Sequence, residues 1–333
     1  MDIRDRRTIR KAAEEALAAN PGDPRKLALI YGGGTALLAL VCSVITYMVG
    51  LQINNTGGLG NLGLRSILST VQSVLPLAQS IFVLFLGFGY QSAVLRLARR
   101  QDCPPASLLD GFRRFGPIVR LALMQGLIYV ALAIAASYVG AQVFVMTPLA
   151  GDYLEIMMPL LSSTSVLSSE VVLDEATLAA ATNAMLPAIP IIVVIFLAIA
   201  IPILYQYRMS TFALFDDPGR GAIAAMRESR GMMRKNRFQL FKIDLSFWWF
   251  YLAEGLIAVL AYGDVLLPML GVVFPWSDTV SYFLFYILSL AFQTGLYYLF
   301  LNRVNVAYAT VYEALRPQPQ EETKAVLGNI FNL

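Results

Sequence analysis

The hydrophobic residues of this chain lie in six long runs separated by polar segments. The runs cover residues 27–51, 67–97, 118–146, 185–207, 240–262 and 280–301. A hydrocarbon core about 30 Å thick needs about 20 mostly apolar residues in an α-helix to cross it, and each run has that length. Transmembrane β-strands would be shorter and would alternate in polarity. The pattern therefore predicts an all-α polytopic membrane bundle with six transmembrane helices.

Composition and charge placement support this membrane assignment. The 333 residues are 57% hydrophobic and only 14% charged, which is typical of membrane proteins and unusual for soluble domains. Of the 25 Lys and Arg residues, all but Arg65 fall before the first run, near the segments that join runs two to three and four to five, or after the sixth. Because positive residues stay in the cytoplasm, both termini are predicted to be cytoplasmic.

The same boundaries predict three regions. Residues 1–26 form a cytoplasmic amphipathic arm, residues 27–302 a six-span membrane domain, and residues 303–333 a cytoplasmic tail. Within the membrane domain, residues 148–182 are predicted to form an outside loop and residues 216–238 a cytoplasmic basic helix. The outside loop carries acidic residues and no basic one: Asp152, Glu155, Glu170, Asp174 and Glu175.

Three cytoplasmic segments share a design. Residues 8–20, 107–116 and 216–236 each precede an apolar run, so the chain is predicted to hold three repeats of a surface helix followed by a membrane hairpin. In the first segment Thr8 is the expected helix cap. In the third, Asp217 is the expected cap, with Pro218 at the first helical position.

The third surface helix separates two kinds of residue at 100° per residue. One stripe consists of Arg227, Arg230, Arg234 and Arg237. A separate face consists of Ala222, Ala225, Met226, Ser229, Met232 and Met233. Such a helix can lie along the cytoplasmic leaflet with its arginines on anionic headgroups. The alternative is that the stripe only holds the topology.

Two segments resemble elements of a known family. The stretch "SRGMMRKNRFQLFKIDLSF" (229–247) and the shorter "DGFRRFG" (110–116) are similar to the signatures of a bacterial family of uncharacterised integral membrane proteins. Asn236 and Phe238 stand near positions where that family tends to have Gly and Trp, and the acidic outside loop looks like an insertion. The resemblance implies a six-helix fold in a bacterial cytoplasmic membrane, and it implies no activity.

Two charged residues open the fifth run. Lys242 and Asp244 fall within the first turn or so of the span, where a lysine can reach the interface and an aspartate lies near the positive helix end. We expect Asp244 to tie the surface helix or a neighbouring arginine to the span, with Arg120 and Arg303 as candidate partners. A contact with substrate is the alternative.

Glu254 is predicted to lie deeper. It follows Leu240 by 14 residues, about 21 Å along a straight helix and past the midplane, where a carboxylate needs a partner or a function. With the glutamines of other runs it can build a polar path through the bundle: Gln79, Gln91, Gln125 and Gln293. The alternative is that these glutamines only join helices by hydrogen bonds.

Candidate chemistry is narrow. The chain has no histidine, which excludes histidine metal sites and histidine-dependent triads, and no phosphate-binding lysine motif or nucleophile elbow is present. We expect no enzyme activity, cofactor, metal or nucleic acid, and an intramembrane enzyme ranks third among the possible functions.

The first hypothesis is a transport or export component for a small or amphipathic solute. The second is a scaffold or regulator whose basic helices bind anionic membrane lipid, a protein partner or a second copy.

Overall fold

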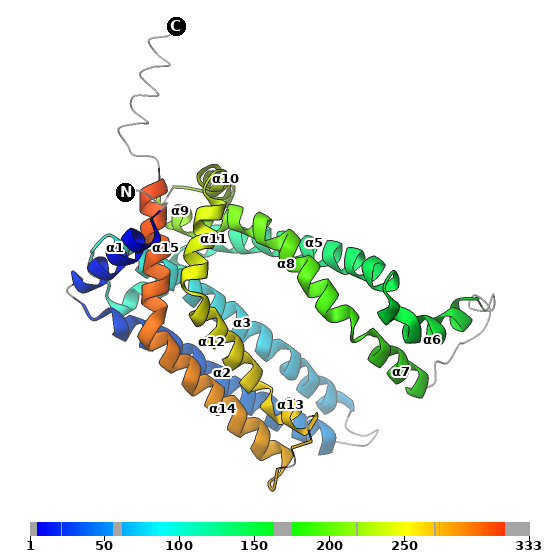
Figure 1. Cartoon of the computed structure of the whole chain (residues 1–333). Helices are drawn as coiled ribbons and strands as arrows, with labels where there is room; N and C mark the ends of the chain where they lie inside the picture. Colours follow the sequence, from blue (N-terminus) through cyan, green and yellow to red (C-terminus); the bar gives the residue numbers. More distant parts are fainter. Residues whose placement is uncertain are drawn as a thin grey trace. The chain divides into compact units, whose positions relative to one another are not determined.

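The computed structural model describes residues 5–20, 22–55, 62–162, 175–217, 219–269, 271–272 and 274–316. Every regular element within these residues is a helix (Figure 1), so the predicted all-α class is confirmed. Most of the predicted C-terminal tail and part of the acidic outside loop lie outside the described residues. The chain divides into a larger unit, Met1–Val119 with Met209–Leu333, and a smaller unit, Arg120–Arg208.

Five helical stretches in the described residues are long and apolar enough to cross a membrane: Pro24–Asn55, Gly63–Ala98, Phe115–Val145, Ala188–Asp216 and Asp278–Leu315. They coincide with five of the six predicted runs. The first three correspond to α2 (Pro24–Asn55), α3 (Leu62–Ala98) and α5 (Phe115–Val145). The fourth joins α8 (Ala188–Tyr207) to α9 (Ser210–Asp216), and the fifth joins α14 (Asp278–Leu296), the π-helix η5 (Tyr297–Leu301) and α15 (Asn302–Leu315). The chain is therefore a multi-pass membrane protein by length and composition.

The fifth predicted run is broken. It forms α11 (Arg237–Ser246) and α12 (Trp248–Ala261), which meet at 67°, so the prediction of one straight helix over 240–262 is wrong. The two helices count as a sixth membrane span only if they cross the membrane together as one bent segment. Phe247 at the bend is buried, and the guanidinium group of Arg10 lies 5.3 Å from its ring centroid. Because that contact comes from a distant segment, hydrophobicity along the run does not reveal the bend.

In the larger unit α2 and α3 pack side by side, α14 contacts α2 and α12, and α13 (Gly263–Met269) follows α12 against α14 (Figure 1). On the N-terminal side α1 (Arg6–Ala18) contacts α15 and buries Ile9, Ala13 and Ala16. The prediction that Thr8 caps this helix is wrong. Asp5 caps this helix, accepting hydrogen bonds from the Arg7 backbone N–H at 3.0 Å and the Thr8 hydroxyl at 2.5 Å.

The basic surface segment forms α10 (Ala222–Met233), and all six residues of its predicted second face are buried. The helix begins after Gly221, so Asp217 is not its cap. The Asp217 carboxylate instead accepts a hydrogen bond from the Gly219 backbone N–H at 2.9 Å and lies 3.7 Å from Arg220. Because α10 ends at Met233 and α11 begins at Arg237, residues 216–238 are not one helix. Pro218 lies outside the described residues.

The segment expected to form the second surface helix is docked on α3. It forms the 3₁₀ helix η2 (Pro105–Leu109) and α4 (Asp110–Arg113). An ideal Cβ on Gly111 would lie 2.0 Å from the backbone oxygen of Phe85, and one on Gly89 would lie 1.9 Å from that of Leu108. Asp110 also pairs with Arg96 of α3 at 2.6 Å. Two glycines therefore allow backbone-to-backbone contact at this point.

The smaller unit holds most of α5, the 3₁₀ helix η3 (Pro148–Ala150), α6 (Gly151–Ser162), α7 (Glu175–Met185) and α8. Its core contains Phe144, Ala150 and Ala188. The described part of the predicted outside loop 148–182 is thus largely helical, with α6 in contact with α7. The three-repeat organisation stays a prediction.

Candidate functional site

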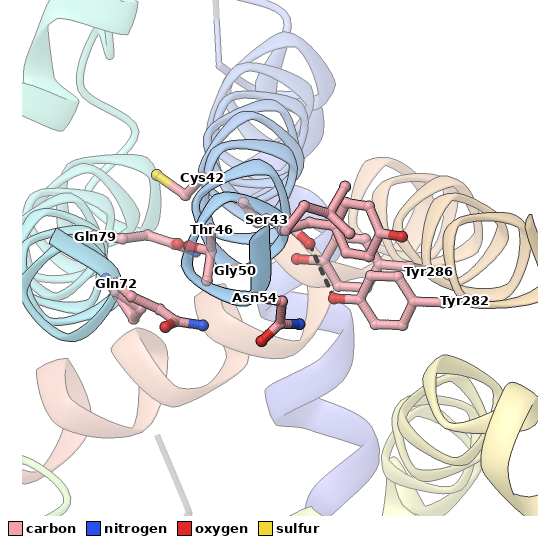
Figure 2. Close-up of a pocket in the computed structure, with 13 residues that line it drawn as sticks. Cys42, Ser43, Thr46, Gly50, Asn54, Gln72, Gln79, Tyr282 and Tyr286 are labelled. Atoms are coloured by element: carbon pink, nitrogen blue, oxygen red, sulfur yellow. Dashed lines mark hydrogen bonds between the residues drawn. The ribbon is translucent and has the colours of Figure 1, made fainter. Parts of the chain in front are cut away.

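A cavity of about 500 Å³ lies between α2, α3 and α14 in the larger unit (Figure 2). Its lining in the described residues is uncharged, and the polar part comes from Ser43, Thr46, Tyr47, Asn54, Gln72, Gln79, Tyr282 and Tyr286. Figure 2 shows Gln72 and Gln79 pointing from α3 toward α2. Pro76 lines the same cavity and removes the backbone hydrogen bond that would reach the carbonyl of Gln72.

One wall of the cavity is held by side-chain hydrogen bonds between α2 and α14. The hydroxyl groups of Ser43 and Tyr282 lie 2.9 Å apart, and those of Tyr47 and Thr279 lie 2.6 Å apart. The three side-chain amides that line the cavity differ from these hydroxyl groups. Within the described part of the chain, the side chains of Asn54, Gln72 and Gln79 form no hydrogen bond. They are therefore available to a bound molecule or to water.

A second polar group surrounds Glu254 of α12, nearer to the start of α2 than the cavity and further along α14. Its carboxyl group interacts with the Tyr297 hydroxyl, which also accepts a hydrogen bond from the Gln293 amide at 3.2 Å. The Tyr297 ring packs against Gly32, where an added Cβ would lie 3.0 Å from it. Tyr297 begins the π-helix η5, an irregularity found frequently at functional sites.

Further tyrosines and amides extend this group, which we call the Glu254 cluster: Glu254, Gln293, Tyr297, Tyr31, Tyr90, Asn302, Asn305 and Gln91. The Tyr31 ring stacks on Tyr90 at 4.6 Å between centroids, and the Tyr90 hydroxyl donates to the Asn302 side chain at 2.6 Å. Gln91 donates to Asn305 at 3.4 Å. The cluster thus joins α2, α3, α12, α14 and α15.

The bend at Phe247 changes the depth of Glu254. The estimate of about 21 Å assumed a straight helix from Leu240 and does not hold, because α11 and α12 meet at 67°. Counted from Trp248, where α12 begins, Glu254 lies roughly 9 Å along the helix. Tyr31 lies at a similar distance from the start of α2 at Pro24. The Glu254 cluster therefore lies level with the first third of α2, whereas the cavity lies beside later residues of α2, from Ala39 to Asn54.

Comparison with known proteins places the chain in a family. Residues 1–318 match the family described as Protein of unknown function (DUF975). The chain belongs to this family. No curated protein and no solved structure matches the sequence. The match spans both segments on which the resemblance rested, so the prediction of an uncharacterised family is confirmed.

The predicted polar-path residues separate into three places in this family member. Glu254, Gln293 and Gln91 fall in one cluster, whereas Gln79 lines the cavity. Gln125 belongs to the smaller unit, where it lines a cavity of about 300 Å³ with Tyr205 and Arg208. Sequence reasoning missed Tyr31, Tyr90, Tyr297 and Asn302. Their signal was an aromatic hydroxyl or an amide within an otherwise apolar run.

The predicted clamp residues have specific neighbours. Asp244 accepts a hydrogen bond from the Tyr308 hydroxyl of α15 at 2.5 Å, and Tyr308 also bonds to Tyr251. Lys242 lies 4.7 Å from the ring centroid of Phe238, one turn earlier on α11. Arg303 is exposed, and Arg120, also exposed, belongs to the smaller unit. Asp244 thus links α11 to α15 through a tyrosine, whereas the expected tie to Arg120 or Arg303 stays a prediction.

The predicted arginine stripe is split between elements. Arg227 and Arg230 lie on α10, Arg234 is its C-terminal cap and Arg237 begins α11. The first three are exposed and Arg237 is half-buried. Because the opposite face of α10 is buried in the protein, three arginines of this family member face outward.

A charged cluster at the ends of α3, α9 and α15 was not foreseen. Asp216 pairs with Arg99 and, at 3.0 Å, with Arg316, and it accepts a hydrogen bond from the Tyr312 hydroxyl at 3.0 Å. Arg99 also pairs with Glu313 at 2.7 Å. Burial disfavours the charged form of Arg99, but the hydrogen bonds to both carboxylates outweigh it and raise the pKa of the guanidinium. This arrangement is structural, because its charges satisfy one another.

Proposed function

We propose that the protein is a non-enzymatic transport or export component that takes up a small or amphipathic solute in the cavity between α2, α3 and α14. The observation that supports this is a set of three amides, Asn54, Gln72 and Gln79, that line a cavity between apolar helices and form no side-chain hydrogen bond with any residue that the structure describes. Polar side chains in transmembrane segments are costly and mark solute pathways. If they only joined helices, they would be hydrogen-bonded across the helix interface.

The lining limits the chemistry of the solute. Among the described residues no charged side chain lines the cavity, and its apolar part includes Ala39, Cys42 and Leu51 with the rings of Tyr282 and Tyr286. Amides and hydroxyls offer both hydrogen-bond donors and acceptors. The expected solute is therefore uncharged within the cavity, with a polar group that reaches the amides and an apolar part that contacts the rings.

A second candidate is the membrane scaffold or regulator. The observation that favours it is the outward-facing group Arg227, Arg230 and Arg234, because exposed basic residues beside a membrane attract anionic lipids at about 1 kcal/mol each. This function needs no cavity. Loss of solute flux with cavity variants separates the two candidates.

The flux test uses purified protein in proteoliposomes and a panel of uncharged and amphipathic solutes. Changing Gln72 and Gln79 together to Leu should reduce flux of the transported solute by roughly tenfold or more, because two hydrogen bonds of about 1 kcal/mol each are lost. Gln52→Leu is the matched control, since Gln52 is exposed on α2 and does not line the cavity.

Flux that is no faster than in protein-free liposomes for every solute would contradict transport. Equal loss in the Gln52→Leu control would show that the effect comes from folding instead of the cavity. The melting temperature of each variant is measured in the same detergent to make this distinction.

Glu254 provides a separate test of a proton-linked role. Glu254→Gln keeps the shape of the side chain and can still hydrogen-bond to Tyr297, so the unfolding free energy should change by less than about 1 kcal/mol. The titratable group is lost, so any pH dependence of flux should disappear. Flux that keeps the wild-type pH profile in Glu254→Gln would assign Glu254 a structural role, and Tyr297→Phe, which removes the hydroxyl that Glu254 contacts, would then lower the unfolding free energy by about 1 kcal/mol.

A further inference from the structure

A small groove of about 30 Å³ lies on the larger unit beside the bend between α11 and α12. Its lining comes from four helical elements that are far apart in the chain: Arg10 and Glu14 of α1, Phe247 and Trp249 at the bend, Phe300 of η5, and Arg303 with Val304 of α15. Neither proposed function uses this groove. It combines exposed charge with aromatic rings at the point where α12 begins.

The charged side chains of the groove are exposed. Arg10, Glu14 and Arg303 all face outward, so the lining carries one net positive charge. The Arg10 guanidinium lies over the Phe247 ring at 5.3 Å, a cation–π contact that orients it. In the part of the chain that the structure describes, neither arginine forms an ion pair. Both guanidinium groups can therefore bind the oxygens of an anion, and planar guanidinium groups suit phosphate.

Exposed apolar residues stand next to the groove residues along the chain. Trp249 packs edge-on against Phe300 at 4.6 Å between ring centroids. Nearby on α12 and η5, Trp248 is 59% exposed, and Leu252 and Leu299 are each 50% exposed. Tryptophan is enriched at the boundary between headgroups and hydrocarbon. A ligand that fits this surface has an anionic group at one end and an apolar part at the other.

We propose that this groove binds an anionic phospholipid. The phosphate group lies between Arg10 and Arg303, and the acyl chains run along the exposed residues of α12 and η5. A free phosphate would use the two arginines but would leave the neighbouring apolar surface without a partner. The inference does not depend on the proposed transport function, because the groove shares no residue with the cavity.

The site also has a structural consequence at the bend. Arg10 reaches Phe247 from the N-terminal helix α1, so a lipid phosphate held by Arg10 and Arg303 joins α1 and α15 at the entry to α12. A bound anionic lipid is therefore expected to stabilise the packing of α1 on the larger unit.

Quenching of Trp249 fluorescence by brominated lipid tests the proposal on the full chain. The chain has three tryptophans, so Trp248→Phe combined with Trp276→Phe leaves Trp249 as the reporter. Brominated phosphatidylglycerol should quench it at a mole fraction at least about tenfold lower than brominated phosphatidylcholine, since two basic residues contact the anionic headgroup. Adding Arg10→Gln and Arg303→Gln should abolish this difference.

Two controls make the result specific. Arg100→Gln with Lys235→Gln removes the same charge at two exposed positions that do not line the groove, and it should leave the preference for phosphatidylglycerol unchanged. Arg10→Lys with Arg303→Lys keeps the charge and should retain part of the preference for phosphatidylglycerol. Equal quenching by both lipids, or an unchanged preference in the Arg10→Gln and Arg303→Gln variant, would overturn the proposal. Displacement of the lipid by inorganic phosphate at an equal concentration would assign the groove to a free anion and would also overturn it.

Discussion

Gly111→Ala should unfold the protein at a much lower temperature than the wild type, with a loss of about 3 kcal/mol or more in the free energy of unfolding. The added Cβ would lie 2.0 Å from the Phe85 backbone oxygen and 2.9 Å from the Gly89 backbone nitrogen. Both neighbours are backbone atoms of α3, so no side-chain rotation can relieve the overlap. The measurement is the thermal unfolding of purified protein in detergent, followed by tryptophan fluorescence.

Gly116→Ala provides the matched control from the same "DGFRRFG" segment. In the described structure, no atom beyond the chain neighbours and the local helix backbone lies within 4 Å of a Cβ added there, and alanine is favoured over glycine in a helix. Its unfolding temperature should equal or slightly exceed that of the wild type. If Gly111→Ala and Gly116→Ala unfold at the same temperature, the close packing of α4 on α3 is absent from the folded protein.

The second large effect is expected for Asp216→Asn. This change removes the carboxylate that two arginines and a tyrosine share, and it leaves Glu313 as the one remaining carboxylate partner of both Arg99 and Arg316 in the described residues. Breaking a fully buried pair costs about 3–5 kcal/mol. Because the side chains of Asp216 and Arg99 are 18% and 24% exposed, we expect a smaller loss, about 2–3 kcal/mol.

Asp217→Asn, one residue along the chain, serves as the comparison. The Asp217 side chain is 51% exposed and lies 3.7 Å from Arg220, and exposed pairs contribute about 0–1 kcal/mol. Chemical and thermal unfolding of the two variants should therefore differ clearly. Similar small losses for both would show that solvent screens the Asp216 cluster as fully as a surface pair.

The membrane helices and the buried face of α10 were predictable from the local pattern of apolar and polar residues. Runs of about 20 apolar residues identified five membrane helices because helix length must match bilayer thickness. The 100° rotation per residue identified the buried face of α10, from Ala222 to Met233, because residues three and four apart share one side of a helix. Both inferences use only the geometry of a single helix.

Element ends and the candidate site were less predictable. Thr8 and Asp217 are reasonable helix caps by residue type, yet α1 is capped by Asp5 and α10 begins after Gly221. Glu254, Gln91 and Gln293 were recognised as polar residues in apolar runs, but Tyr31, Tyr90 and Tyr297 were not. Their importance comes from stacking and hydrogen bonding between helices, which residue type does not reveal.

The sequence by itself therefore determined that the chain is helical, that it belongs in a membrane and which face of α10 turns inward, since these follow from interactions within one helix or with the bilayer. Only the tertiary structure decided where α11 and α12 bend, why Gly89 and Gly111 are glycines, and which residues surround Glu254. Those features depend on contacts such as Arg10 with Phe247 and Gly32 with Tyr297. Each of these two contacts joins residues more than 200 positions apart. At that separation a local pattern of apolar and polar residues carries no information about which residues contact each other.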